Sequence, residues 1–355
     1  MRAQPIKVGI VGAGNNTRAR HIPGLQAIEG VEIVSVCNRS RESSQRVADA
    51  FKLPKIYEDW RELVAADDTH AIVIGTWPYL HCEVTCAALD AGKHVMCEAR
   101  MGMDAAEAHV MLEKSQAHPE LIAQVVPAPF TFQADRTIQE LIAAGYLGDL
   151  YAMTIRVVTG GFANPDTPIH WRQRRDLSGL NVLQMGIWYE SAMRWIGPAS
   201  AVFARTRTFT QKRPDPETGG MLEVDLPDHV DIIADLPGGA QATYQFSSVC
   251  GLAPAPEVWL FGSQGTLHFV FTGFTSSKLY GGQRGDQELR EIPIPAEKAG
   301  KWRVEEEFVG AIRGEEPLRL TTFADGVKYM EFTEAVHRSA TSGQVVSLPL
   351  TNVRR

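Results

Sequence analysis

The chain up to Val126 alternates between short apolar runs and helical patterns, and this alternation restricts the possible folds more than any other feature. Ile6–Val11, Val31–Cys37 and Ala71–Gly75 have the length of strands, and the last is apolar enough to be buried on both faces. Further strands are expected at His94–Cys97 and Leu121–Val126, and helices at Thr17–Ile28, Arg41–Phe51, Trp60–Ala66, His81–Ala91 and Asp104–Ala117. Short connections between such elements predict a doubly wound parallel sheet, an α/β domain over residues 1–126.

After Pro127 the pattern changes to longer strands in which apolar and polar residues alternate, as in Tyr151–Val158. Such alternation is typical of an antiparallel sheet with one face on the core. Residues 127–355 are therefore predicted to form an α+β domain with a large, mostly antiparallel open sheet, whose final helix is a candidate to pack back on the first domain. The expected strands include Val230–Ala234, Gln241–Phe246 and Val258–Phe261, the helices are Ala134–Ala144, Val182–Trp195, Arg303–Ile312 and Ala324–Ser342, and the polar stretches Lys212–Glu217 and Gln283–Glu291 are expected loops.

Composition excludes several classes of partner. The 355 residues are 44% hydrophobic, enough for two cores, and 35 Lys and Arg against 42 Asp and Glu leave a net charge of −7. This balance argues against a general electrostatic grip on nucleic acid or an anionic membrane. No apolar run approaches the ~18 residues of a membrane span, and no leader pattern precedes the first strand. Five cysteines in mostly apolar contexts indicate a reduced, cytoplasmic protein, and no second Cys/His pair completes a metal site with Cys82 and Cys86.

A glycine-containing loop joins the first strand to the first helix, in the context that a dinucleotide-binding fingerprint requires. Gly12 permits the tight turn, and Gly14 lets the backbone approach a pyrophosphate that the helix N-terminus favours. Thr17 takes the third position, where Gly or Ala would let the helix come closer to the strand. The loop Gly12, Gly14, Asn15, Asn16 and Thr17 is therefore predicted to bind a dinucleotide, with a purely structural turn as the alternative.

The end of the second strand indicates which dinucleotide this is. An NAD-binding site usually places a carboxylate there to hold the ribose 2′-hydroxyl, but this chain reads Cys37-Asn38-Arg39-Ser40-Arg41. Two guanidiniums could bind a 2′-phosphate, so Asn38, Arg39 and Arg41 favour NADP, with NAD possible. In the alternative interpretation, Arg41 is a solvated residue at the start of a helix.

Several segments, taken in order and spacing, resemble the Gfo/Idh/MocA family, the glucose–fructose oxidoreductase and inositol dehydrogenase group. They are Val8–Gly14, Thr76–His81, Ala91–Glu98, Trp171-Arg172, Gly186 and Phe323–Gly343. The resemblance implies an N-terminal Rossmann domain, a C-terminal domain whose open sheet forms a homodimer or homotetramer, and hydride transfer between a nicotinamide and a sugar, cyclitol or related hydroxyl carbon. It adds Thr76, Trp77, His81 and Glu98 to the expected cofactor site.

The chain departs from this family at the positions that exchange protons. The family has a Glu-Lys-Pro run, but here Glu98 is followed by Ala99 and Arg100. The family also has an Asp and a His four residues apart, and Gln184 and Trp188 stand in their places. Ala, Gln and Trp cannot exchange a proton near neutral pH, so the chain resembles an atypical member.

His170 is the candidate replacement for the missing base, because the segment before Trp171 runs toward the substrate pocket in the family. The alternative is a loop histidine without a role. The expected pocket comprises Arg100, Trp171, Arg172, Gln184 and Trp188. With Arg174 and Arg175, the arginines suggest an anionic substrate such as a sugar acid or sugar phosphate, although a solvated loop explains these two equally well.

Three hypotheses follow. The first is an NAD(P)-dependent oxidoreductase acting on a hydroxyl or ketone of a sugar, cyclitol or sugar acid, with non-standard acid–base residues. The second is a nucleotide-binding member that has lost ordinary dehydrogenation and serves regulation or altered chemistry. The third is a structural protein in which the Gly12 turn binds nothing.

Overall fold

The structure, a computed structural model, describes residues 4–353 and divides the chain into two units. The first contains the chain up to Pro127 together with Arg303–Met330, and the second contains Ala128–Trp302 and Glu331–Val353. The sequence placed the first boundary at residue 126 and assigned everything after it to the second domain. The segment Arg303–Met330 belongs to the first unit instead, because an apolar helix pattern shows that a face is buried but not against which core.

The first unit is built on six parallel strands in the order β3-β2-β1-β4-β5-β6, which confirms the predicted doubly wound sheet. The strands are β1 (Ile6–Val11), β2 (Val31–Cys37), β3 (Lys55–Tyr57), β4 (Ala71–Ile74), β5 (His94–Cys97) and β6 (Ala123–Val125). Every residue of β4 is buried, as its apolar run predicts. The short edge strand β3 was not predicted, since three residues that include a lysine carry too little pattern.

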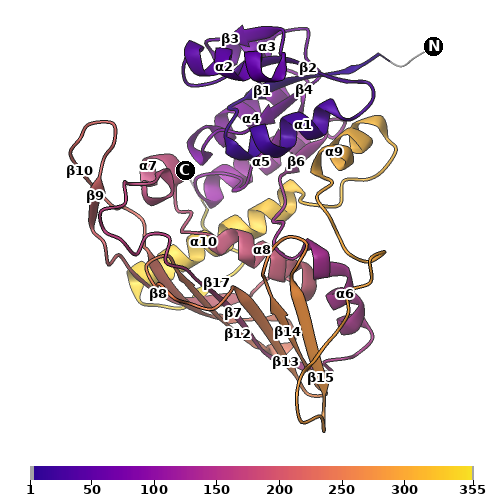
Figure 1. Cartoon of the computed structure of the whole chain (residues 1–355), viewed down its shortest axis with the longest axis vertical. Coiled ribbons are helices and arrows are strands. Elements are labelled where there is room, and N and C mark those ends of the chain that lie inside the picture. Colours follow the sequence, from indigo (N-terminus) through magenta and orange to yellow (C-terminus); the bar gives the residue numbers. More distant parts are fainter. Residues whose placement is uncertain (1–3, 354–355) are drawn as a thin grey trace. The chain divides into compact units, whose positions relative to one another are not determined.

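Helices lie on both sides of this sheet (Figure 1). They are η1 (Thr17–His21), α1 (Ile22–Gln26), α2 (Arg41–Phe51), α3 (Trp60–Ala65), η2 (Pro78–Leu80), α4 (His81–Asp90), α5 (Ala105–Ala117) and α9 (Val304–Arg313). The expected helix Thr17–Ile28 divides into a π-helical turn, η1, and the short α1. Asp104 caps α5, since its carboxylate accepts the Glu107 N–H. The returning segment is tied to β6 by Val125, whose N–H donates to the Thr321 carbonyl at 3.0 Å.

The second unit contains a nine-stranded sheet in the order β16-β15-β14-β13-β7-β12-β11-β8-β17. All neighbours are antiparallel except β12 and β7, which confirms the predicted mostly antiparallel sheet. Its strands are β7 (Leu150–Val158), β8 (Ala201–Arg207), β11 (His229–Asp235), β12 (Gln241–Ser247), β13 (Glu257–Gly262), β14 (Gly265–Val270), β15 (Lys278–Gln283), β16 (Arg290–Glu291) and β17 (Val346–Ser347).

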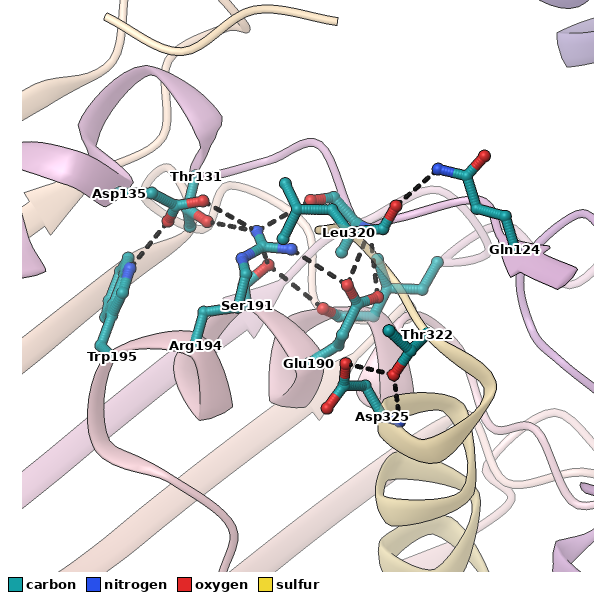
Figure 2. A network of polar contacts seen from close by, with 12 residues as sticks. Gln124, Thr131, Asp135, Glu190, Ser191, Arg194, Trp195, Leu320, Thr322 and Asp325 are labelled. Carbon is teal, nitrogen blue, oxygen red and sulfur yellow. Dashed lines mark hydrogen bonds and ion pairs between the residues drawn. The ribbon is translucent and has the colours of Figure 1, made fainter. Parts of the chain in front are cut away.

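Helices α6 (Phe132–Ala143) and α8 (Met185–Ile196) lie on one face of this sheet (Figure 1). A buried polar network joins them (Figure 2): the Arg194 guanidinium pairs with Asp135 at 3.1 Å and Glu190 at 3.0 Å. Glu190 also accepts the Ala128 N–H. The remaining helices are η3 (Trp171–Gln173), α7 (Arg175–Ser178), η4 (Pro237–Gly239) and α10 (Phe323–Ser342).

Both stretches expected to be loops contain strands. Lys212–Pro214 forms β9, which pairs with β10 (Met221–Glu223) in a separate hairpin. The second stretch contains the last residue of β15 and all of β16. Charged residues obscured the strand pattern of the hairpin: Arg213 is fully buried, and its guanidinium donates to the Phe162, Asn164 and Thr167 carbonyls. In the described part of the chain, no helix combines the length and apolarity that crossing a membrane requires.

Candidate functional site

The loop after β1 requires glycine at position 12 and leaves little room for a side chain at position 14. Gly12 has φ +84°, and a Cβ there would lie 2.6 Å from the Thr76 nitrogen. A Cβ at Gly14 would lie 3.2 Å from the Gly75 carbonyl oxygen. The missing side chains leave an open backbone cradle at the start of the first helix, which is the shape that a pyrophosphate requires.

Thr17, at the third position of the fingerprint, is accommodated by another glycine. Its side chain is buried and Oγ1 donates to the Gly12 carbonyl at 3.4 Å. A Cβ at Gly75 would lie only 2.0 Å from this Oγ1. In the usual fingerprint, a Gly or Ala at the third position leaves space between helix and strand. Here Gly75, after β4, leaves that space for the Thr17 side chain.

A cavity of about 1310 Å³ opens at this loop, and all of its lining residues belong to the first unit. It exceeds the ~300–1,000 Å³ usual for sites of small ligands, so it has room for a dinucleotide. The predicted cofactor residues that line it are Gly12, Gly14, Asn15, Asn38, Arg39, Thr76 and Trp77.

Five other predicted cofactor residues, Asn16, Thr17, Arg41, His81 and Glu98, are not among the lining residues. Arg41 is exposed and pairs with Glu58 at 2.5 Å, so its charge is already engaged. His81 is fully buried, with its ring nitrogens 2.8 Å from the Arg100 carbonyl and 3.0 Å from the Thr76 carbonyl. Burial lowers the pKa of His81, although these carbonyls partly offset the effect.

At the end of β2, the two polar residues differ in what they do. The Asn38 side chain accepts the Ala13 N–H at 2.7 Å and donates to the Ser43 carbonyl at 3.1 Å, so it braces the glycine loop against α2. The Arg39 guanidinium lies 6.0 Å from the centre of the Trp77 ring, and both side chains line the cavity. Arg39 is therefore the better placed of the two predicted guanidiniums for an anionic group of a ligand.

Sequence reasoning missed several lining residues, among them Arg18, Ser43, Arg46, Trp60 and Arg61. Arg18 and Ser43 follow the ends of β1 and β2, where the motif places the nucleotide, so the sequence could have identified them. Trp60 and Arg61 come from α3, whose approach to the loop no local pattern shows. Glu58 and Asp59 also line the cavity, but Glu58 pairs with Arg41 and Asp59 caps α3.

A buried charged cluster lies beside the loop. His21 places Nε2 2.9 Å from Glu98 and Nδ1 2.5 Å from Glu305, and the Asn16 amide donates to the same Glu98 oxygen. Burial alone would lower the pKa of His21, but the hydrogen bonds to Glu305 and Glu98 raise it to about 9. Burial would raise the pKa of Glu98, but hydrogen bonds and the charge of His21 hold it below its usual value. We call His21 and the two carboxylates the Glu98–His21–Glu305 cluster. Sequence reasoning identified Glu98 but missed His21 and Glu305.

His170, the predicted base, lies in the second unit and caps η3. Its Nδ1 accepts the backbone N–H of Arg172 at 3.2 Å, while the backbone N–H of His170 donates to the Gln173 side chain at 3.1 Å. A ring nitrogen that accepts a hydrogen bond carries no proton, so the neutral imidazole has its proton on Nε2. Burial and the positive charge of Arg172 lower the pKa of His170, which favours this neutral form.

Gln184 and Trp188 lie on one face of α8, as their spacing of four predicts. The Trp188 indole N–H donates to the Gln184 side chain at 3.4 Å, and the indole is 1% exposed. Its ring stacks on Phe130 at 5.0 Å and meets Phe271 edge-on at 5.9 Å. The two neighbours Tyr189 and Glu190 are buried rather than solvent-facing.

The predicted arginine cluster separates into different environments. Arg100 is 1% exposed, and the Arg172 guanidinium lies over the Trp171 ring at 4.2 Å. Arg174 pairs with Asp176 at 2.6 Å, and the Arg175 guanidinium lies 2.9 Å from His337. The partners of Arg174 and Arg175 agree with the interpretation of these two as solvated surface residues, although Arg175 begins the short helix α7 and does not lie in a loop.

The geometry of the first unit therefore fits a dinucleotide, with a glycine cradle for the phosphates and a guanidinium in the same cavity. Within residues 4–353, no group of three His, Cys, Asp or Glu side chains is arranged to hold a metal ion.

Comparisons with known proteins agree with this architecture. A model of the oxidoreductase family with an NAD-binding Rossmann fold matches residues 6–124, and a model of the GFO/IDH/MocA C-terminal domain matches residues 136–268. Among curated proteins, trans-1,2-dihydrobenzene-1,2-diol dehydrogenase of Bos taurus is 25% identical over 292 residues, 82% of this chain and 79% of the relative. D-xylose 1-dehydrogenase (NADP(+)) 2 of Haloferax volcanii is 27% identical over 218 residues, 61% of this chain and 65% of the relative.

Solved structures show the same fold. Levoglucosan dehydrogenase in complex with NADH and L-sorbose superposes with a TM-score of 0.85 at 22% identity, covering 97% of this chain and 99% of that one. An oxidoreductase domain protein from Kribbella flavida gives 0.85 at 23% identity, covering 98% of this chain and 100% of that one. With both family models matched in order along one chain, the protein belongs to the Gfo/Idh/MocA family of oxidoreductases.

Proposed function

We propose that this protein is a cytoplasmic, NADP-dependent oxidoreductase that acts on a hydroxyl or ketone group of a sugar, cyclitol or sugar acid. The glycine cradle with Arg39 in the adjoining cavity is the observation that carries the proposal. Relatives named as dehydrogenases of D-xylose and of trans-1,2-dihydrobenzene-1,2-diol support a cyclic polyol or sugar as the substrate class. No disulfide joins any of the five cysteines, which all lie within residues 4–353, and this fits a reducing compartment.

When bound, the nicotinamide supplies the chemistry of accepting or donating a hydride. The N–H groups of Gly12 and Ala13 already donate to Cys37 and Asn38, so the backbone amides from Gly14 onward would hold the diphosphate. Arg39 would bind the 2′-phosphate through charge-assisted hydrogen bonds. The absence of a carboxylate at Asn38 removes the repulsion that NAD-binding sites direct at this phosphate.

The test compares two neighbouring arginines. Arg39→Ala should raise the Kd for NADPH by roughly 10- to 100-fold, because one charge-assisted contact is worth about 1.5–3 kcal/mol, and should leave the Kd for NADH nearly unchanged. Arg41→Ala, which removes the exposed partner of Glu58, is the matched control and should change neither Kd. Equal affinities of the wild-type protein for NADPH and NADH would contradict the NADP preference, and binding of neither would contradict the proposed function.

For His170 we propose the role of a hydrogen-bond donor to the reacting oxygen. The sequence suggested a base, but a base needs a free lone pair, and Nδ1 already accepts the Arg172 N–H. For Nε2 to accept a proton, the neutral ring would have to carry its hydrogen on Nδ1. That Nδ1–H would point at the backbone N–H of Arg172. A neutral Nε2–H can instead stabilise negative charge that develops on a substrate oxygen.

A second candidate function rests on α8. Gln184 and Trp188 bond to each other, and Trp188 is stacked into an aromatic cluster. Neither side chain exchanges protons near neutral pH. This favours a nucleotide-binding protein without ordinary dehydrogenase activity. Tight NADPH binding without any absorbance change across a panel of sugars, cyclitols and sugar acids would support it, and turnover of any of them would exclude it.

We also propose that a second copy of the chain covers the open face of the nine-stranded sheet. Ile233 of β11 and Phe261 of β13 point out of this sheet and are 50% and 38% exposed. Light scattering should give a dimer or tetramer, and Ile233→Asp should shift it toward the monomer; a monomeric wild-type protein would contradict the proposal.

A further inference from the structure

The Glu98–His21–Glu305 cluster joins segments that lie far apart in the sequence. His21 ends η1, Glu98 follows β5, and Glu305 lies in the first turn of α9, 284 residues after His21. All three belong to the first unit. The side chains of His21 and Glu305 are 0% and 2% exposed, and that of Glu98 is 15% exposed. Buried charges of this kind persist only when they are paired and hydrogen-bonded.

The surrounding chain is built to admit this cluster. A Cβ at Gly24 of α1 would lie 2.9 Å from Glu305 Cγ and 3.0 Å from its Oε2, so any larger residue would force the Glu305 side chain to shift. On the other side, Glu98 Oε2 accepts the Ala99 N–H at 3.1 Å, while Oε1 accepts from His21 and Asn16. The Glu98 carboxylate is thus fixed by three donors.

Both ring nitrogens of His21 face a carboxylate. The imidazolium ion donates to Glu98 and to Glu305 at once, whereas the neutral ring has a single N–H and leaves one carboxylate without a donor. The opposing charges of Glu98 and Glu305 keep the pKa of His21 at about 9 despite burial. The titratable neighbours of Glu98 do not add a charge of their own: burial lowers the pKa of His81 and so favours its neutral ring, and burial raises the pKa of the Cys97 thiol and so favours its protonated form.

We propose that Glu305 and His21 are positioning residues for the nucleotide: Glu305 holds His21 as the imidazolium, His21 fixes the Glu98 carboxylate, and Glu98 fixes the Asn16 amide beside the cavity. Asn15, the residue before Asn16, lines that cavity, so the position of Asn16 sets the loop that meets the ligand. This inference rests on the proposed nucleotide-binding function. It assigns to α9 a part in binding, although α9 contributes no lining residue.

The experiment measures the Kd for NADPH by its fluorescence from about pH 7 to about pH 10.5, a range in which the 2′-phosphate, with its pKa near ~6, keeps its charge. The wild-type Kd should stay constant to about pH 8 and rise at least about threefold above pH 9, where His21 loses its proton. In Glu305→Gln the same rise should begin at least about one pH unit lower, because one of the two carboxylates that hold the proton is gone.

Glu306→Gln is the matched control, since Glu306 is the exposed neighbour on the same turn of α9. It should reproduce the wild-type profile. In Glu305→Asp, the rise in Kd should begin at a pH between those of the wild-type protein and Glu305→Gln. A Kd that is flat to pH 10.5 in the wild-type protein, or identical profiles for Glu305→Gln and Glu306→Gln, would overturn the inference. If Glu305→Gln does not fold by circular dichroism, the wild-type profile and the Glu305→Asp midpoint decide the question. Failure of the wild-type protein to bind NADPH at any pH would overturn the proposed function instead.

Discussion

At the scale of single residues, glycines decide whether the end of β1 can form the nucleotide cradle. Gly12 requires a backbone conformation that other residues avoid, and the space for its Cβ is taken by the backbone at Thr76. Gly92 after α4 shares the positive φ, at +69°, but no atom lies within 4 Å of the place where its Cβ would be. The two positions therefore separate backbone strain from loss of the cradle.

Gly12→Ala should abolish NADPH binding and lower the free energy of unfolding by about 2 kcal/mol or more, because strain and a backbone clash act together. Gly92→Ala should lose only about 1 kcal/mol and bind NADPH as the wild-type protein does. Thermal unfolding and fluorescence titration measure the two effects. Undiminished binding by Gly12→Ala would show that the cradle is not the nucleotide site.

The role of His170 is also decided at this scale. His170→Gln keeps an N–H donor and should retain more turnover than His170→Phe, by roughly 10-fold or more, since a lost donor to a developing oxyanion costs about 2.7–4 kcal/mol. Steady-state rates on an identified substrate across pH provide the measurement. If His170 is a base instead, the wild-type rate should rise with pH through an ionisation near or below 6.5, the usual histidine pKa. This rise should then be absent in His170→Gln.

At the scale of elements, helix α8 depends on the ion pairs of Arg194 (Figure 2). This guanidinium is 9% exposed and lies between Asp135 of α6 and Glu190 of its own helix. Glu190 in turn holds the chain at Ala128. Removing one member of the network leaves the other charges buried without their partner, so the position of α8 depends on this network.

Arg194→Leu should therefore lower the free energy of unfolding of the second unit by about 3–5 kcal/mol. Arg136→Ala on α6 is the control: Arg136 also pairs with a glutamate four residues away, but its side chain is 63% exposed. Its loss should change stability by at most about 0.5 kcal/mol. Denaturant unfolding followed by tryptophan fluorescence compares them, and equal effects would contradict a structural role for the buried network.

At the scale of the whole molecule, stability should depend on pH through His21. Its pKa is about 9 in the folded protein, above the usual 6.5, so the folded state binds this proton more tightly. The resulting stabilisation is complete below about pH 6.5 and is lost as the pH rises through about 9. The lowered pKa of Glu98 acts in the opposite direction, since its stabilisation is present above the usual 4.5 and is lost in acid.

The midpoint of thermal unfolding should consequently fall between pH 6.5 and pH 9 in the wild-type protein. His21→Gln should unfold at a lower temperature near neutral pH and should show less of this decline. Calorimetry of both proteins over this range measures it. A midpoint for His21→Gln that falls as steeply as that of the wild-type protein would exclude His21 as the source.

The two folds and the glycine loop could be predicted from the amino-acid sequence alone. These features are local: strand and helix periods, a turn that needs glycine, and the chemistry of side chains at fixed spacings can all be recognised within one segment. The sequence did not predict two short strands, the charged Lys212–Pro214 and the three-residue edge strand β3. Their burial comes from neighbours outside the segment.

Which groups come into contact is visible in the folded structure alone. It placed Arg39 rather than Arg41 at the cavity, assigned Arg303–Met330 to the first unit, and brought Glu305 to His21. It also fixed which ring nitrogen of His170 is engaged. Apolar periodicity shows that a face is buried without showing its partner, and a charge in the sequence does not reveal its counter-charge. Contacts across hundreds of residues exist only once the chain has folded, because burial and pairing are properties of the assembled core.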